Sequence, residues 1–263
     1  MKNIFRKIIS ALTLSAVVLT GAAVFSSCSE KDVSDMEKVK KNGKLVVGIT
    51  EYEPMDYKDA NGEWTGFDAE FASLFAERLG VECEFIVIDW DNKLFELSSG
   101  AIDCIWNGMT ITNEIKTSCA VSNPYVENRQ VVVMAADKAS EYSTLDDMAE
   151  LRFTAEAGSA GESCVSEMKN YTAVNDQSTA ILEVASGSAD ACVIDATMAN
   201  AMTGEGTSYA DLAVAAELTN EQYGVAFRKD SDLCAEFNAA MAEFKADGKL
   251  PALAEKYKLT LAE

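Results

Sequence analysis

Residues 101–116 read Ala-Ile-Asp-Cys-Ile-Trp-Asn-Gly-Met-Thr-Ile-Thr-Asn-Glu-Ile-Lys. The apolar run at the start of this stretch ends abruptly at Asn107-Gly108, and two threonines follow. This pattern predicts a buried strand whose carboxyl end exposes amide and hydroxyl groups, which is where ligands bind in open α/β sheets. The same design recurs in weaker form at residues 188–197. We therefore predict a two-lobed protein that binds a ligand between these two strand ends.

The composition narrows the classes of partner. The chain has 263 residues, of which 48% are hydrophobic, and a formal net charge of −21. A chain of this length can bury a sizeable core. So acidic a surface repels nucleic acid, and we expect no nucleic-acid partner. The absence of histidine excludes histidine-based catalytic triads, and the seven cysteines form no C-x-x-C pair. We therefore expect no metal and no cofactor, and buried free thiols at the six cysteines after Cys28, with disulfides as the alternative in an exported protein.

The first 27 residues have the organisation of a signal peptide. Lys2, Arg6 and Lys7 precede an apolar stretch that ends in small residues before Cys28. This order is typical of a lipoprotein signal, with lipid attached at Cys28; an uncleaved membrane anchor is the alternative. The polar residues 28–42 then predict a tether that holds the folded part on the outer face of the membrane.

The rest of the chain alternates strand-like and helical patterns. Strands are expected at residues 45–49 and 83–88, with a helix between them over residues 67–79 that Gly80 ends. The second half repeats this order. Ser99-Gly100 and Ser186-Gly187 each follow a helical pattern, and in both cases two further residues precede an aspartate and a strand. Such alternation predicts a parallel sheet with helices on its faces, once in each lobe.

A set of short motifs in order carries a family resemblance. They are Leu45-Val46-Val47-Gly48, Tyr52-x-Pro54, Gly66-Phe67-Asp68, Asp89-Trp90-Asp91, Gly108-Met109-Thr110-Ile111-Thr112, Pro124-Tyr125, Ala157-Gly158-Ser159, Tyr223-Gly224-Val225-Ala226 and Lys245-Ala246-Asp247-Gly248. Over residues 43–258 the chain resembles extracytoplasmic solute-binding proteins of the polar amino-acid ABC-transporter type, or family 3 periplasmic binding proteins.

The resemblance implies a type II periplasmic-binding-protein fold. Each lobe would be a mostly parallel sheet flanked by helices, and two hinge strands would join the lobes. Residues 43–132 with 226–263 would form lobe 1, and residues 133–225 would form lobe 2. The implied partners are an amino-acid-like ligand, an ABC permease and, through Cys28, the membrane, and we expect a monomer.

The resemblance also implies roles for single residues. The aromatic rings of Tyr52 and Trp90 would sandwich the ligand side chain. The ligand α-carboxylate would bind the Asn107-Gly108 loop and Thr110 from one lobe, and Ser159 from the other. Asp195 would pair with the ligand ammonium group. The residues alone also allow other roles. They favour a helix N-cap for Asp195, and they leave a roof over the first core as the alternative for Trp90 and a turn residue as the alternative for Ser159.

The sequence departs from the family pattern at one important position. Family members usually carry an arginine three residues after the second threonine, where it grips the carboxylate, and this chain has Ile115. Isoleucine offers nothing to an anion. Either Lys116 or Arg129 replaces the arginine, or the ligand has no free α-carboxylate, or binding is weak.

Two functions are compatible with these patterns. The first is capture of a small polar, amine-bearing solute for a permease, without chemistry. The second is an exported dehydratase on the same fold, for which Asp195, Glu156 or Glu162 would have to act as acid or base. The missing arginine counts against the second function, because the substrates of such dehydratases are anions.

The departure at residue 115 leads to a prediction. Ile115→Arg should strengthen the binding of ordinary L-amino acids, because a guanidinium fork pairs with a carboxylate in two hydrogen bonds. Titration calorimetry of the variant would measure the change. An unchanged affinity would mean that another residue already binds the carboxylate.

Overall fold

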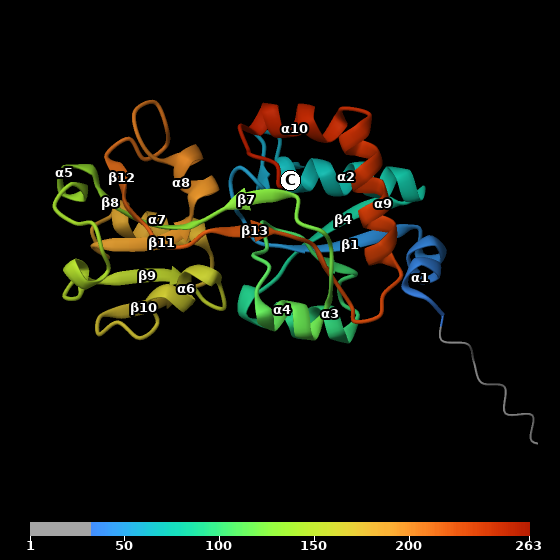
Figure 1. Cartoon of the computed structure of the whole chain (residues 1–263), viewed down its shortest axis with the longest axis horizontal. Helices are drawn as coiled ribbons and strands as arrows, with labels where there is room; N and C mark the ends of the chain where they lie inside the picture. Colours follow the sequence, from blue (N-terminus) through green and yellow to red (C-terminus); the bar gives the residue numbers. More distant parts are fainter. Residues whose placement is uncertain (1–32) are drawn as a thin grey trace, which may run out of the picture. The chain divides into compact units, whose positions relative to one another are not determined.

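The structure, a computed structural model, describes residues 33–263, which contain two five-stranded sheets. Each sheet has helices on its faces, and the two sheets belong to two lobes (Figure 1). The predicted two-lobed α/β architecture is confirmed. The predicted signal peptide and lipidation site Cys28 lie outside the described residues. Within the described residues, no helix combines the length and the apolar character that crossing a bilayer requires.

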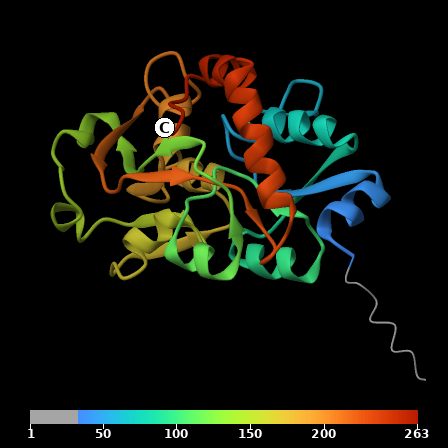
Figure 2. The same ribbon diagram turned by 45° about the vertical axis from the view of Figure 1, so that its right-hand side comes forward.

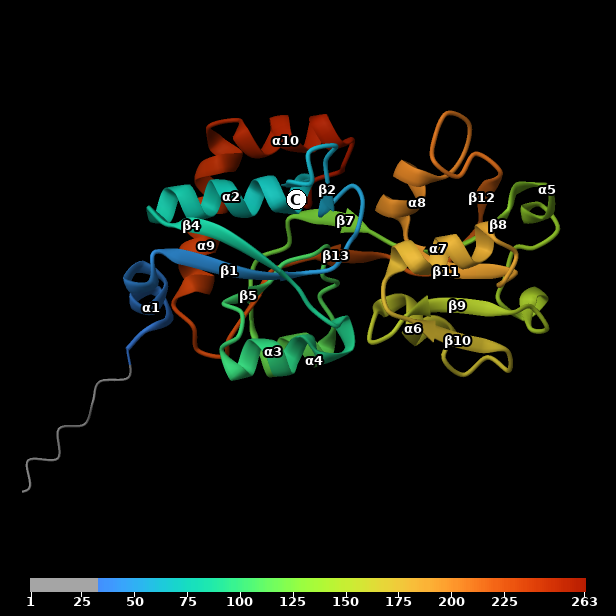
Figure 3. The same ribbon diagram turned by 180° about the vertical axis from the view of Figure 1, so that it is seen from behind.

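The first lobe is built around a sheet with strand order β4-β1-β5-β14-β6. Helices α2, α9 and α10 lie on one side of this sheet, and α3 and α4 lie on the other (Figures 1 and 3). Figure 2 shows the two C-terminal helices, in red, packed beside α2. The elements of this lobe are α1 (Asp35–Asn42), β1 (Lys44–Ile49), β2 (Tyr57–Lys58), β3 (Trp64–Thr65), α2 (Phe67–Leu79), β4 (Glu82–Val87), η1 (Trp90–Asn92), α3 (Lys93–Ser99), β5 (Cys104–Ile105), α4 (Asn113–Ser118), β6 (Ala120–Val121), β14 (Ala226–Phe227), α9 (Leu233–Ala246) and α10 (Lys249–Tyr257).

The second lobe is built around a sheet with strand order β10-β9-β11-β8-β12. Its elements are β8 (Gln130–Ala135), α5 (Ala136–Ala139), η2 (Asp146–Met148), β9 (Phe153–Glu156), α6 (Ala160–Val165), β10 (Tyr171–Val174), α7 (Gln177–Ala185), β11 (Ala191–Asp195), α8 (Ala196–Met202) and β12 (Leu212–Glu217). In both sheets two of the four strand pairings are parallel and two are antiparallel. The expectation of mostly parallel sheets was therefore wrong, because the first strand after each crossing between the lobes runs opposite to its neighbours. This strand is β8 in the second sheet and β14 in the first.

The side chains of the central strands alternate between two apolar clusters. In β11, Cys192 and Ile194 face the cluster that contains α7 and α8. Their neighbours Ala191 and Val193 face the cluster that contains α6. The alternation follows from the two-residue period of a strand, and both faces are apolar because helices cover both. The sheet is therefore a buried platform whose strand ends are the parts that reach the lobe surface.

Two antiparallel strands, β7 (Val126–Asn128) and β13 (Glu221–Tyr223), connect the lobes. Residues 130–132, which we expected in lobe 1, pair within the second sheet as part of β8. Residues 224–225, which we expected in lobe 2, hydrogen-bond to Met109 and Ser122 of the first lobe. We therefore propose that the chain crosses between the lobes at β7 and β13, a few residues earlier than the predicted boundaries.

The end of the predicted tether is a helix. Helix α1 begins at its N-cap Ser34, whose hydroxyl accepts a hydrogen bond from the Glu37 backbone N–H. The residues Ser34-Asp35-Met36-Glu37 fit the capping-box pattern, a signal that the reading of this segment as a tether overlooked. Residues 35–42 therefore belong to the folded unit, and the tether prediction was wrong for them.

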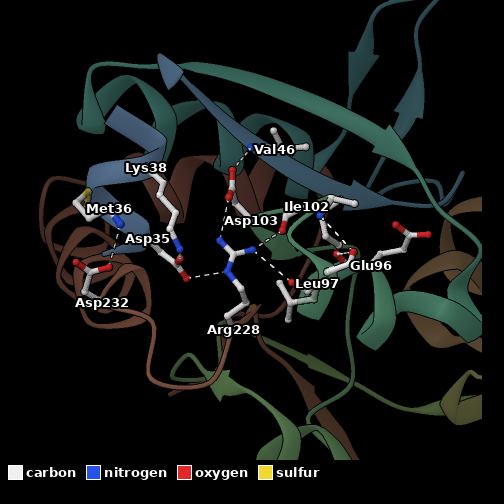
Figure 4. Close-up of polar contacts among 12 residues, drawn as sticks. Asp35, Met36, Lys38, Val46, Glu96, Leu97, Ile102, Asp103, Arg228 and Asp232 are labelled. Atoms are coloured by element: carbon white, nitrogen blue, oxygen red, sulfur yellow. Dashed lines mark hydrogen bonds and ion pairs between the residues drawn. The ribbon is translucent and has the colours of Figure 1, made fainter. Parts of the chain in front are cut away.

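Arg228 fastens α1 to the first lobe (Figure 4). Its guanidinium donates to Asp35 Oδ2 at 2.9 Å, to Asp103 Oδ1 at 3.0 Å and to the Ile102 carbonyl oxygen at 2.6 Å. The arginine and both carboxylates are largely shielded from solvent, with side chains 9–18% exposed. Shielded pairs with several hydrogen bonds are strongly coupled, so removal of one partner leaves buried charge behind.

The aspartate that follows each Ser-Gly turn plays the same part in both lobes. The Asp103 N–H donates to the Val46 carbonyl, and its carboxylate accepts from the Val46 N–H. Asp190 makes the same pair of bonds to the backbone of Arg152. The weak internal likeness in the sequence thus corresponds to a repeated structural device that locks the start of β5 or β11 to a neighbouring strand. The six cysteines in the described part of the chain are free thiols.

The Arg228 contacts lead to a prediction about stability. Arg228→Met should lower the free energy of unfolding by about 2–4 kcal/mol, because it leaves two shielded carboxylates without their partner. Urea denaturation followed by circular dichroism measures the loss. Lys169→Met is the control: it breaks an exposed pair with Glu150 and should cost less than about 1 kcal/mol. An Arg228 variant as stable as the control would contradict this role.

Candidate functional site

A small cavity lies between the lobes, at the ends of strands from both sheets. Its volume is about 40 Å³, well below the roughly 300–1,000 Å³ of typical ligand pockets. The lobes already touch across it: Lys93 Nζ donates to the Gly158 carbonyl oxygen at 2.7 Å, and Ser178 Oγ donates to the Glu51 carbonyl oxygen at 3.1 Å. The cavity is lined by Trp90, Asn107, Gly108, Met109, Thr110, Thr112, Gln130, Glu156, Gly158, Ala160, Gln177 and Asp195.

Asp195 is the central polar group of this cavity. Its side chain is buried, and it accepts hydrogen bonds from the side-chain amides of Asn128, Gln130 and Gln177. Burial, together with the negative charge of Glu221, raises the pKa of Asp195 to about 7. Asp195 also occupies the N-cap position of α8, but its carboxylate makes no capping hydrogen bond there. Its carboxylate therefore lines the cavity and does not cap the helix.

Glu156 brings a second carboxylate to the same cavity from the end of β9. It is 2% exposed, and its Oε1 atom has no hydrogen-bond partner among the described residues. Burial raises the pKa of Glu156 well above the ordinary value, and the charges of Asp195 and Asp176 add to this effect. The sequence suggested only a catalytic role for Glu156, so its place in the lining was missed.

Trp90 and Lys93 stand at one side of the cavity. Trp90 is buried in an apolar cluster of the first lobe and also lines the cavity. Lys93 Nζ lies 5.0 Å from the centre of the Trp90 ring and donates to the Trp90 carbonyl. Burial lowers the pKa of Lys93. The helical pattern of residues 92–99 gave no sign that this lysine reaches the other lobe.

The loop after β5 lines the cavity, but its polar groups are engaged within the first lobe. The Asn107 side chain bonds both backbone groups of Thr50 and donates to Asp56. The Gly108 N–H donates to Asp68 Oδ2 at 2.6 Å. Asp68 is fully buried, and burial raises its pKa to about 7. The Gly108 amide, which the resemblance implied for a ligand carboxylate, therefore has a partner inside the protein.

Thr110 is tied to the hinge. Its hydroxyl donates to Glu221 Oε1 at 2.8 Å, and the same oxygen accepts from Asn128 and Gln130 at 2.7 Å each. Glu221 and Asn128 lie on the two hinge strands. The contact network of Asp195 thus extends through Gln130 and Asn128 to the hinge and to Thr110 of the first lobe. The sequence offered no pattern for the amides that hold Asp195, because they come from two distant segments, residues 128–130 and residue 177.

Tyr52 and Ser159 do not line the cavity. Tyr52 is 1% exposed, and its hydroxyl bonds to Thr197 and, at 2.5 Å, to the Tyr223 hydroxyl. Its ring lies close to Gly108, where a Cβ atom would be 2.5 Å from Tyr52 Cε1. Ser159 is the N-cap of α6, and its hydroxyl accepts from the Glu162 N–H. The structure therefore assigns both side chains to the support of the site: Tyr52 beneath the 107–108 loop, Ser159 at the start of α6.

The two cations suggested as replacements for the missing arginine lie elsewhere. Lys116 is exposed and lines a different hollow with Pro124 and Gln222. Arg129 is exposed and pairs with Glu217 at 2.8 Å. Ile115 is 3% exposed within an apolar cluster, so Ile115→Arg would also place a charge among apolar side chains and cost stability. No lysine or arginine is among the lining residues of the described chain.

Comparison with known proteins agrees with this arrangement. The model of bacterial extracellular solute-binding proteins, family 3, matches residues 45–260. The L-cystine-binding protein TcyJ of Escherichia coli (strain K12) is 31% identical over 89% of this chain and 91% of its own. A mutant of ArgBP from T. maritima is 34% identical, covers 85% of this chain and 98% of its own, and has a TM-score of 0.80.

A further solved structure bears on the enzymatic alternative. The ancestral amino acid-binding protein AncCDT-1, described as a precursor of cyclohexadienyl dehydratase, is 31% identical to this chain. It covers 85% of this chain and 99% of its own, with a TM-score of 0.77. The match of the family model over most of the chain decides membership. The chain belongs to the bacterial extracellular solute-binding proteins of family 3.

Proposed function

We propose that this protein acts outside the cytoplasm, where it captures a small amine-bearing, amino-acid-type solute between its lobes and delivers it to an ABC permease. The observation that carries the proposal is Asp195, a buried carboxylate that lines the interlobe cavity and is held by three amide side chains. A buried carboxylate that faces a cavity without a neighbouring cation is suited to bind an ammonium group.

Several lining groups complete the proposed site. Trp90 would form an apolar wall for the solute, and Thr110 would contribute its hydroxyl from the first lobe. Asn107, Gly108, Tyr52 and Ser159 would shape the site through their contacts inside each lobe. Entry of a solute requires the lobes to separate, because the cavity of about 40 Å³ is too small for an amino acid. A rotation about β7 and β13 is the expected motion.

Capture without chemistry is the function that the charges favour. A dehydratase acting on carboxylic acids would have to hold an anion, but the lining within the described residues contains Asp195 and Glu156 and no cation. The neighbour AncCDT-1 is itself described as an amino acid-binding protein. Acid or base groups are present in Asp195 and Glu156, but the means to bind an anionic substrate is not. We therefore propose that the protein is not an enzyme.

We also propose that lipid on Cys28 anchors the protein to the membrane. The support is the order of basic, apolar and small residues before Cys28. Because Ser34 already caps α1, the stretch between Cys28 and the folded unit is short. The short stretch would keep the solute-loaded protein close to the membrane surface, where the permease lies. We propose that the protein acts as a monomer.

A thermal-shift screen tests the amine assignment. Amino acids and amines should raise the melting temperature, since a ligand at 100 times its Kd adds about 2.7 kcal/mol to the free energy of unfolding. Asp195→Asn should abolish the shift, whereas Asp137→Asn, at an exposed position of the same lobe, should keep it. If only purely anionic compounds shift the melting temperature, or if Asp195→Asn binds as the native protein does, the proposed role is wrong.

The raised pKa of Asp195 predicts a pH dependence. A cationic solute binds the ionised carboxylate, so its affinity should fall below pH 7, by about tenfold per pH unit when one group is protonated. The same protonation stabilises the ligand-free fold as the pH falls from 7 toward 4, because the folded pKa lies above the unfolded value. Calorimetry between pH 5 and 8 measures this loss, and an affinity that is constant over the range would contradict it.

A further inference from the structure

The charges of the cavity narrow the chemical class of the solute, provided that the proposed function holds. Two carboxylates, Asp195 and Glu156, line the same small space, and no lysine or arginine lines it within the described chain. Each carboxylate is nearly inaccessible to solvent, with exposures of 4% and 2%. Burial beside each other raises the pKa of both carboxyl groups, so their ionised forms are costly here unless something positive joins them. A single ammonium group would neutralise only one of them.

Glu156 is in particular need of a partner. The Asp195 carboxylate is held by three amides, whereas Glu156 Oε1 has no donor among the described residues. Two donor groups within the protein act on Glu156, the Thr50 hydroxyl and the Lys93 ammonium. The Thr50 hydroxyl donates to Asn107 Oδ1 at 2.7 Å. The Lys93 ammonium, however, donates to the carbonyls of Gly158 and Trp90 and rests on the Trp90 ring. Glu156 Oε1 therefore needs a hydrogen-bond donor from outside the protein.

Among the described residues that line the cavity, no side chain carries a positive charge that could pair with a carboxylate. The Gly108 N–H donates to Asp68, and the Thr110 hydroxyl donates to Glu221. Lys116 and Arg129 are exposed and line other hollows. A carboxylate brought into this space would lie beside two acidic side chains without a cation of its own, which is an expensive arrangement.

We infer that the solute is a small dication without a carboxylate group, a diamine or a guanidino-amine. One cationic group binds Asp195, and the other donates to the free oxygen of Glu156. Trp90 packs against the apolar chain between them. Glu156 is then the residue that selects for the second positive charge.

Matched pairs of compounds test this inference by calorimetry at pH 8. 1,5-Diaminopentane differs from lysine, and agmatine from arginine, only in lacking the carboxylate. Pentylamine lacks the second cation. At least one of the two dications should bind about 100-fold more tightly than its own amino acid and than pentylamine, since a mispaired buried charge costs several kcal/mol.

Variants of the protein distinguish the contact proposed at Glu156 from the contact proposed at Asp195. Glu156→Gln should weaken the dication by at least about tenfold and pentylamine by less than about threefold. Glu150→Gln removes an exposed carboxylate of the same lobe and should change neither.

Three results would overturn the inference. In the first, lysine and arginine bind more tightly than 1,5-diaminopentane and agmatine. In the second, Glu156→Gln weakens the binding of pentylamine as much as that of the dication. In the third, neither dication binds. In the first two cases a loss of binding in Asp195→Asn would leave the proposed capture of amines intact. If Asp195→Asn binds every compound as the native protein does, the proposed function itself fails.

Discussion

The structure depends on a carboxylate that is buried between two lobes without a cation of its own. Asp195 ends β11 and is held by amides from a hinge strand, from β8 and from α7. Such a group is tolerable when neutral, and its pKa is accordingly raised to about 7. Ionised, it requires a positive partner, and the fold places an interlobe cavity beside it. Binding of a cation and closure of the lobes thus favour each other.

The groups around the cavity are positioned by the ends of strands and by the hinge. β5, β9 and β11 all end at the cavity, so a loop or side chain from each reaches it. Glu221 on β13 joins Thr110 of the first lobe to Asn128 and Gln130, so the hinge is in direct contact with the groups that hold Asp195. A change of angle at the hinge would therefore alter the surroundings of the Asp195 carboxylate. For the same reason, binding of a cation at Asp195 can shift the equilibrium between open and closed lobes.

Local patterns in the sequence were enough for much of the fold. The helix over residues 67–79 is present, and Gly80 ends it with φ of 75°. The paired Ser-Gly turns and their aspartates correctly indicated two lobes of similar design. Of the residues predicted to contact a ligand, Tyr52 and Ser159 support the site from outside it, whereas the others line the cavity: Trp90, Asn107, Gly108, Thr110 and Asp195. Lys93, Gln130 and Glu156 were missed because their role comes from the approach of distant segments, which no local spacing records.

The central claim is that a positively charged group of the solute lies against Asp195. A crystal structure of the protein with its solute bound tests this most directly. We expect a nitrogen of the solute within about 3 Å of an Asp195 oxygen, in a closed cleft with Trp90 against the solute. A solute that places a carboxylate or an apolar group there, or that binds away from the cavity, would contradict the account.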